Sequence, residues 1–232
     1  MSAEILVVRC GLVAYEEALV AQRWLRAARL EGAVPDVLLL LEHPPVYTRG
    51  RRSDDGELPM AREWYEMQGI EVAETDRGGR VTYHGPGQLV AYPIVSLRPF
   101  DEDVHEYVRR LERVAIETLA EHGVSATTVE GLTGVWTSDR KIGSIGVHVS
   151  RGVTTHGLAV NVNNDLQPFE WIVPCGIEGC RVTSLSRELG AEQDLDAFAD
   201  ALANRFAEVY RREPSAATPA ELGLDSARLG VA

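Results

Sequence analysis

One lysine and one cysteine stand apart from the other reactive side chains of this sequence. Lysine and arginine together number 23, and the single lysine is Lys141. A guanidinium is effectively always charged, whereas a desolvated ammonium can lose its proton. Lys141 is therefore a candidate for acid–base work that arginine cannot perform, although coding bias alone would also explain the excess of arginine.

The cysteine of interest is Cys175, which lies between a proline and a glycine in the segment WIVPCGIEGC. The following RVTSLSREL is typical of a helix start, and the partial positive charge there favours thiolate over the free thiol, whose pKa is about 8.5. Because thiolate is the reactive form, Cys175 is a candidate nucleophile. The alternative is a small buried hydrophobe, which is also our interpretation of Cys10. Cys180 is spaced too widely from Cys175 for CxxC redox chemistry.

A glycine-rich segment, RGGRVTYHGPGQ at residues 77–88, could bind a ligand. Its glycines allow positive φ and close approach of backbone N–H donors to a carbonyl or phosphate, but it has neither the Walker nor the GxGxxG spacing. A pair of structural turns is the alternative. His84 and His156 each stand beside glycine, and each is a candidate pocket-wall residue or general base, or else a structural histidine.

Composition excludes several classes of protein. The net charge of −12 disfavours a general nucleic-acid binder, and no run approaches the roughly 20 apolar residues that span a bilayer. The six histidines form no HxxxH pair, so we expect no metal site, and no GxSxG supports a serine hydrolase. The N-terminus lacks a basic segment followed by a long apolar one, and the three cysteines suggest no disulfide framework, so a cytoplasmic location is expected.

The hydrophobic pattern interleaves strands with helices. We expect strands at 5–9, 37–41, 70–75 and 89–95 and several more over 124–162, and helices at 13–31, after Pro59, and at 102–122, 182–189 and 195–212. This arrangement predicts an α+β fold, a mixed β-sheet with packed helices. Residues 1–212 are predicted to form one catalytic domain, and the Ala/Pro-rich tail at 213–232 is predicted to wrap the surface or fray.

Five blocks, in order, together resemble the octanoyltransferase family of lipoate biosynthesis, also called lipoyl(octanoyl) transferase or lipoate–protein ligase B. They are LEHPPVYTRG at 41–50, RGGRVTYHGPGQLVAYPI at 77–94, GVWTSDRKIGSIGVHV at 134–149, THGLAVNVN at 155–163, and PCGI with RVTSL at 174–185. The resemblance implies the fold shared by biotin and lipoate protein ligases. It also implies transfer of an octanoyl or lipoyl group from acyl carrier protein to lipoyl domains.

The resemblance implies the following roles. Cys175 matches the acyl-accepting cysteine and Lys141 the lysine that acts with it. The segments that match the acyl site are Arg77, Gly78, Gly79, Arg80, Val81, Thr82, Tyr83 and His84, then Ser144, Ile145 and Gly146, and Gly157, Leu158 and Ala159. The expected acceptors are the lipoyl domains of 2-oxoacid dehydrogenases and the glycine cleavage H protein. No cofactor is expected.

Both partners in this family are acidic proteins, whereas this chain carries a net charge of −12. We expect a local basic face near the mouth of the site, formed by Arg49, Arg51, Arg52, Arg77, Arg140 and Arg181; a solvated charged surface is the alternative. Three rival functions stay open at this point. They are an ATP-dependent lipoate ligase on the same fold, a lipoyl amidotransferase, and a non-catalytic acyl-binding module.

Overall fold

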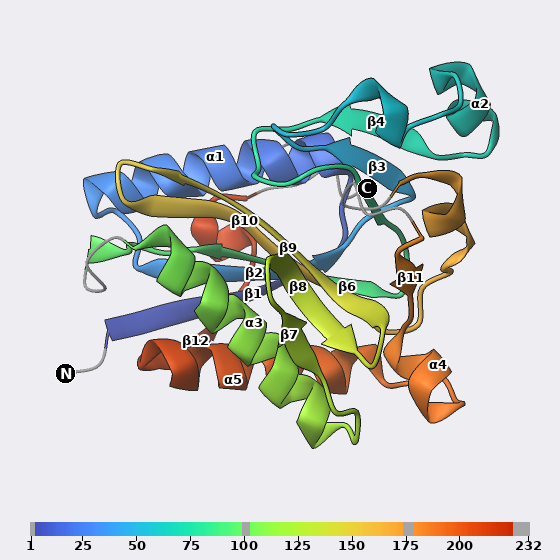
Figure 1. The fold of residues 1–232 in the computed structure, drawn as a ribbon. Helices are drawn as coiled ribbons and strands as arrows, with labels where there is room; N and C mark the ends of the chain where they lie inside the picture. The colour runs from blue at the N-terminus through green and yellow to red at the C-terminus, as the bar shows by residue number, and fades with distance from the viewer. Residues whose placement is uncertain (1–2, 99–102, 174–178, 225–232) are drawn as a thin grey trace.

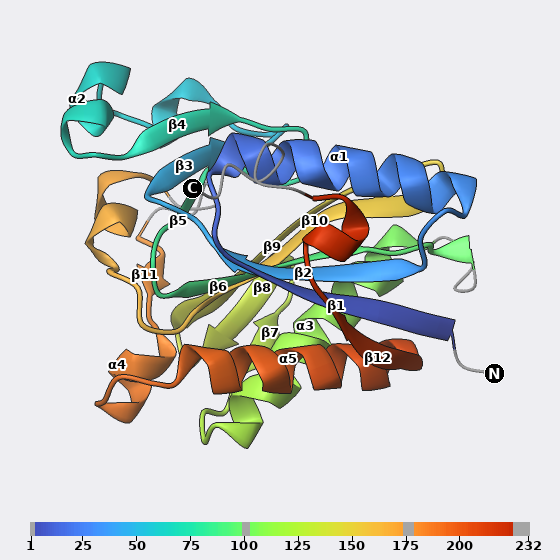
Figure 2. The same ribbon diagram turned by 180° about the vertical axis from the view of Figure 1, so that it is seen from behind.

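A mixed sheet forms the centre of the molecule, and helices cover both of its faces (Figures 1 and 2). The computed structural model describes residues 3–98, 103–173 and 179–224. Within these residues the sheet has nine strands in the order β12-β1-β2-β6-β10-β9-β8-β7, with β11 paired to β9. Their bounds are β1 Ala3–Leu12, β2 Asp36–Glu42, β6 Gln88–Ile94, β7 Thr127–Val129, β8 Leu132–Thr137, β9 Arg140–Ser150, β10 Val153–Asn161, β11 Arg181–Val182 and β12 Arg212–Ala217.

A second, three-stranded sheet lies beside the first, in the order β4-β3-β5. Its strands are β3 Val46–Arg49, β4 Glu71–Glu74 and β5 Thr82–His84, and the short helix α2 (Arg62–Met67) packs nearby. Helix α1 (Tyr15–Glu31) covers the face of the main sheet on the side of this small sheet, as Figure 2 shows. Helices α3 (Val104–Glu121) and α5 (Leu195–Tyr210) cover the opposite face, and α4 (Leu185–Leu189) follows β11.

The two covered faces explain the run of four leucines in β2. Leu38 and Leu40 pack into the core beneath α3 and α5, whereas Leu39 and Leu41 pack into the core beneath α1. A strand buried on both faces carries a continuous apolar run rather than an alternating one. The prediction of a buried strand at 37–41 is confirmed, and so is the α+β fold with a mixed sheet.

The longer predicted helices are confirmed, and most of the predicted strands have counterparts. The helix expected over 182–189 begins only at Leu185, because Ser184 caps it through the Arg187 N–H and Arg181–Val182 pair with β9 instead. Three further strands, β3, β5 and β11, are too short to show a pattern in the sequence.

The start of the tail is the main difference from the prediction. Residues Arg212–Ala217 form β12, which pairs in parallel with β1 at the edge of the main sheet rather than fraying. Arg212 anchors it, since its Nε donates to Oδ2 of the buried Asp36 at 2.8 Å. Pro214 is accommodated because an edge strand leaves one side of its backbone without a partner strand.

Among the described residues, no helix combines the length and the apolar character that a membrane crossing requires.

Candidate active site

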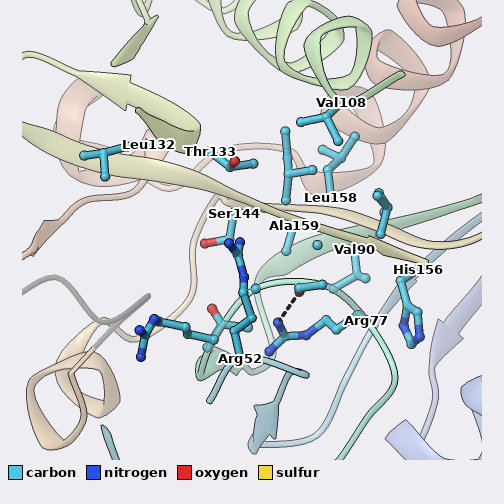
Figure 3. A pocket seen from close by; sticks show the side chains of 18 of the residues that line it. Arg52, Arg77, Val90, Val108, Leu132, Thr133, Ser144, His156, Leu158 and Ala159 are labelled. Atoms are coloured by element: carbon cyan, nitrogen blue, oxygen red, sulfur yellow. Dashed lines mark hydrogen bonds between the residues drawn. The ribbon is translucent and has the colours of Figure 1, made fainter. Parts of the chain in front are cut away.

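A cavity of about 470 Å³ lies where the glycine-rich segment meets β9 and β10 (Figure 3). This volume falls within the usual range for small-molecule sites. Arg52, Arg77 and Ser144 lie on one side of the two strands, and Val108 and Leu158 lie on the other. The cavity thus brings together segments from the small sheet, the middle of the main sheet and α3.

Most of the residues that the sequence assigns to an acyl site line this cavity together with Lys141. Those on the cavity wall are Arg77, Gly78, Gly79, Arg80, Thr82, His84, Ser144, Ile145, Gly146, Gly157, Leu158 and Ala159. Val81 and Tyr83 differ from this expectation. Both are buried in a separate apolar cluster with Tyr47 and Phe169, because alternate residues of an extended segment face opposite sides.

Arg77 holds the glycine-rich segment in place from inside the molecule. Its Nη2 donates to the carbonyl oxygen of Thr48 at 2.6 Å and to the Thr48 hydroxyl at 2.7 Å. The next residue, Gly78, donates its N–H to the carbonyl of Val147 on β9 at 2.9 Å. The segment is therefore fixed to β3 of the small sheet and to β9 of the main sheet.

Glycines are required where this segment touches its neighbours. A Cβ on Gly146 would lie 2.8 Å from the carbonyl oxygen of Gly78, and a Cβ on Gly50 would lie 2.5 Å from that of Gly79. Gly157 likewise has no room for a Cβ, which would collide with the carbonyl of Ala91 on β6. The dense glycine spacing in β9 and β10 thus reflects close backbone contacts at the cavity wall.

Lys141 is buried at the start of β9, with 4% of its surface exposed. Its Nζ donates to the carbonyl of Thr133 at 3.2 Å and lies 5.5 Å from the centroid of the Trp136 ring. Both contacts favour a positive charge. The candidate nucleophile Cys175 falls in the segment 174–178, which lies outside the described residues.

The other two cysteines have different surroundings. Cys10 is buried in the core beneath α1, and burial raises the pKa of its thiol to about 12, so it is a poor nucleophile. This confirms the prediction that Cys10 is a core residue. Cys180 is half-buried. No group of three or more His, Cys, Asp or Glu side chains within residues 3–98, 103–173 and 179–224 is placed to hold a metal ion.

His84 belongs to a buried ring cluster with Tyr15, His43 and Tyr92 at the cavity wall. Its Nδ1 donates to Oε1 of Gln88 at 2.6 Å. Burial and the neighbouring His43 hold the pKa of His84 well below its usual value, so its ring is neutral and its Nε2 carries a lone pair.

His156 connects β10 to the beginning of the glycine-rich segment. Its Nε2 donates to Oδ1 of Asp76 at 2.8 Å, and that hydrogen bond holds the pKa of the Asp76 carboxyl below its usual range. Burial lowers the pKa of His156 itself and outweighs the adjacent carboxylate. With φ at 57°, His156 adopts a left-handed conformation that is strained for a residue with a side chain. These contacts fit a wall residue that positions the segment.

The expected basic face is smaller than the sequence suggested. Arg77 is buried, and three others form ion pairs: Arg49 with Asp55 and Glu74, Arg140 with Glu188, and Arg181 with Asp139. Their charges are locally compensated. Of the six arginines proposed, Arg51 and Arg52 are exposed and form no such ion pair with residues 3–98, 103–173 or 179–224, and Arg52 lines the cavity.

Several cavity residues carry no recognisable signal in the sequence. Tyr15 and Tyr92 come from the first turn of α1 and from β6, and Val104, Val108 and Arg109 come from α3. Val108 belongs to an apolar helix stripe that predicts burial but not contact with a cavity. These residues reach the site only through the way the elements pack.

Comparisons with known proteins agree with this architecture. The lipoyl protein ligase A/B catalytic domain matches residues 14–207. The octanoyltransferase of Solibacter usitatus is 47% identical over 200 residues, which are 86% of this chain and 90% of that protein. The octanoyltransferase of Myxococcus xanthus is 45% identical over 221 residues, which cover 93% of this chain; the chain spans 62% of that relative's length.

Solved structures show the same fold at low sequence identity. The bipartite lipoate protein ligase of Thermoplasma acidophilum superposes with a TM-score of 0.74 at 18% identity, covering 93% of this chain and 87% of that one. The Aquifex aeolicus biotin protein ligase, in complex with biotin and ATP, gives 0.55 at 14% identity, with coverage of 90% and 70%. The expected fold of biotin and lipoate ligases is confirmed.

The fold and the matched domain define the chain's class, which is the lipoyl protein ligase A/B catalytic-domain family. Within that family the chain belongs to the octanoyltransferases, as the sequence blocks predicted.

Gly146→Ala tests whether the close contact between β9 and the glycine-rich segment shapes the cavity. The added Cβ would push the Gly78 carbonyl away, so we expect a loss of stability of about 1–3 kcal/mol and a fall in octanoyl transfer of at least ~10-fold. Urea unfolding and steady-state kinetics measure the two effects. Gly56→Ala is the control, because its Cβ would meet only the end of the Asp54 side chain, at 3.3 Å. Parent-like transfer by Gly146→Ala would contradict the argument.

The pH dependence of stability tests the buried ring cluster. His43 donates from Nδ1 to the Val13 carbonyl and accepts at Nε2 from the Tyr92 hydroxyl, and burial lowers its pKa to about 4. A histidine with a lowered folded pKa stabilises the protein above its unfolded pKa of about 6.5, and this stability is lost as pH falls toward 4.

We expect the free energy of unfolding of the parent to fall by about 2 kcal/mol from pH 7 to pH 5 through His43 alone. Urea unfolding followed by tryptophan fluorescence at both pH values measures this fall. His43→Gln should have a shallower pH dependence, whereas His105→Gln, a change at an exposed position on α3, should keep that of the parent. The same slope in the parent and in His43→Gln would rule out the assigned role.

Proposed function

We propose that this chain transfers an octanoyl group from acyl carrier protein to a lysine of a lipoyl domain, through a thioester on Cys175 assisted by Lys141. Octanoyl transfer itself accords with the name of its relatives. The observation that carries the proposed chemistry is a buried ammonium, Lys141, on the wall of the same cavity as the glycine-rich segment. We propose no cofactor, and a cytoplasmic location.

The path of the chain supports a partnership between Cys175 and Lys141. Before the undescribed segment, Val173 donates its N–H to the carbonyl of Glu57. After it, Val182 of β11 stands in register with Lys141, and the Thr183 N–H donates to the Lys141 carbonyl at 2.9 Å. Arg181 and Val182, which follow Cys175 closely in the sequence, therefore form the strand beside Lys141.

In the first proposed step, the Cys175 thiolate attacks the thioester carbonyl of the donor. A new carbon–sulfur bond forms, the bond to the carrier's sulfur breaks, and the carrier leaves as a thiol after taking up a proton. An ammonium within about 4 Å would favour the thiolate by an order of 1–3 kcal/mol, equivalent to roughly one to two pKa units. Backbone N–H groups of the glycine segments are the proposed donors to the oxyanion.

In the second step, the acceptor lysine attacks the acyl-enzyme and Cys175 leaves. The acceptor must be a neutral amine, although a free lysine has a pKa of about 10.4. Lys141 in its neutral form, or the departing thiolate, can remove that proton. Arginine cannot, which gives a chemical reason for a lysine at this one position. The proposed acceptors are the lipoyl domains of 2-oxoacid dehydrogenases and the glycine cleavage H protein.

The rival functions differ in what they need. An ATP-dependent ligase on this fold requires ATP and a free fatty acid. Its reaction cycle does not include an enzyme with the acyl group attached to a cysteine. An amidotransferase takes its acyl group from another lipoyl domain, and an acyl-binding module is never covalently modified. Octanoyl carrier protein, octanoate with ATP, and an octanoylated lipoyl domain, offered separately, distinguish the four possibilities.

We predict that mixing the protein with octanoyl carrier protein adds one octanoyl group, visible by intact mass spectrometry. Cys175→Ala should abolish the adduct, whereas Cys180→Ala, the matched control five residues on, should retain it. Lys141→Arg keeps the charge but cannot act as a base, so its adduct should form and then transfer to a lipoyl domain at least ~10²-fold more slowly. An adduct on Cys175→Ala would overturn the thioester proposal.

We also propose that the donor docks against Arg51 and Arg52, the exposed pair near the cavity. Reversing both charges, in Arg51→Glu/Arg52→Glu, should lower kcat/KM for the acidic carrier by about 10-fold at low salt, and the effect should shrink as salt screens it. Arg23→Glu/Arg211→Glu has the same net charge but places the changes on exposed residues outside the cavity lining. Equal kinetics and salt dependence in the two variants would exclude this docking face.

A further inference from the structure

Glu112 is a carboxylate in the interior of the protein, on helix α3, which packs against β8 and β9 (Figure 1). Only 1% of its side chain is exposed. Oε1 accepts a hydrogen bond from the Gly134 N–H at 3.0 Å, and Oε2 pairs with Nη1 of Arg109 at 2.7 Å. Burying a carboxylate is costly even when it is paired. Packing alone does not account for a charged residue at this position.

Gly134, the residue that Glu112 holds, provides the space for Lys141. Its φ is +133°, and an added Cβ would lie 2.7 Å from Cε and 3.1 Å from Nζ of Lys141. The pairing of β8 with β9 shifts register between Val135 and Trp136, so the strand is irregular beside this point. A side chain here would force the lysine out of its present position.

The residue before Gly134 completes the connection. The carbonyl of Thr133 accepts the hydrogen bond from Lys141 Nζ, while the next N–H in the chain, that of Gly134, points to Glu112. The two bonds come from the two ends of a single peptide group. Because that group is planar, fixing its N–H also fixes the direction of its carbonyl.

We infer that Glu112 is a positioning residue for Lys141: it orients the Thr133–Gly134 peptide, whose carbonyl holds the ammonium. The inference rests on the proposed function, in which Lys141 acts on Cys175. Arg109 has 57% of its side chain exposed and lines the cavity, and it supplies the positive charge that balances the buried carboxylate. The chain thus links α3 to the reacting end of β9 through one carboxylate and one peptide group.

The test measures the thiolate of Cys175 directly. Variants Glu112→Ala, Glu112→Gln, Gly134→Ala and Lys141→Met are made in a Cys180→Ala background, and alkylation of Cys175 by iodoacetamide is followed by mass spectrometry from pH 5 to pH 10. The rate of single-turnover acylation by octanoyl carrier protein is measured for the same variants. The pH midpoint of alkylation reports how strongly Lys141 favours the thiolate.

We expect Lys141→Met to raise the midpoint by about one to two units. Glu112→Ala and Gly134→Ala should raise it in the same direction and slow acylation by about 10-fold or more. Glu112→Gln still offers an oxygen to the Gly134 N–H, so it should restore most of the parent midpoint. A purely structural role would lower stability without moving the midpoint.

Glu106→Ala and Glu106→Gln are the matched controls, because Glu106 also lies on α3 and pairs with an arginine, Arg110, but is 52% exposed. Both should behave as the parent does. If Glu112→Ala is folded and its alkylation midpoint is the same as that of the parent, the inference is overturned. If Glu112→Ala does not fold, a parent-like midpoint in Gly134→Ala overturns the inference. A parent-like midpoint in Lys141→Met instead contradicts the proposed function, so the two failures are distinguishable.

Discussion

The site depends on backbone-to-backbone contact between the glycine-rich segment and β9. Gly78 and Gly146 meet at a distance that no side chain would allow, and Gly50 meets Gly79 in the same way. Arg77, buried between these contacts, bonds to Thr48 on the small sheet. These contacts join the two sheets, and the cavity is the space that remains between the joined elements. Without them, the small sheet would lose a principal connection to β9 and β10, which form the cavity wall.

The second constraint is the burial of charge beside that cavity. An ammonium inside a protein is stable only where fixed dipoles or opposite charges replace water. Lys141 has a carbonyl and an aromatic face, both set by the irregular end of β8. Neutral histidines occupy the region around Tyr15 and Tyr92 instead, because burial disfavours their charged forms. The cavity wall thus combines the cationic side chains of Lys141 and Arg77 with a cluster of neutral aromatic rings.

Much of the fold could be predicted from the sequence, because the spacing of apolar residues in a long helix or strand shows which of its faces is buried. The stripe of α3 and the leucine run of β2 are examples. The strand β12 could not be predicted, because its Ala/Pro-rich sequence has no strand pattern. Its place in the sheet depends on pairing with β1 and on the ion pair between Arg212 and Asp36. Short strands such as β5 are likewise set by tertiary pairing rather than by local preference.

The site, like the fold, was predictable from the sequence only in part. Lys141 and twelve of the fourteen residues that the resemblance assigned to an acyl site line one cavity, although they come from separate segments of the chain. Val81 and Tyr83 face the other side of their segment, in a separate apolar cluster. Of the six arginines, Arg77 is buried, and three are paired with acids that the fold brings near, such as Glu188 for Arg140. Charge at a surface depends on which acids the fold brings near. In a chain with a net charge of −12, the exposed arginines that form no ion pair among the described residues, such as Arg51 and Arg52, are therefore the positions where a local positive charge is left.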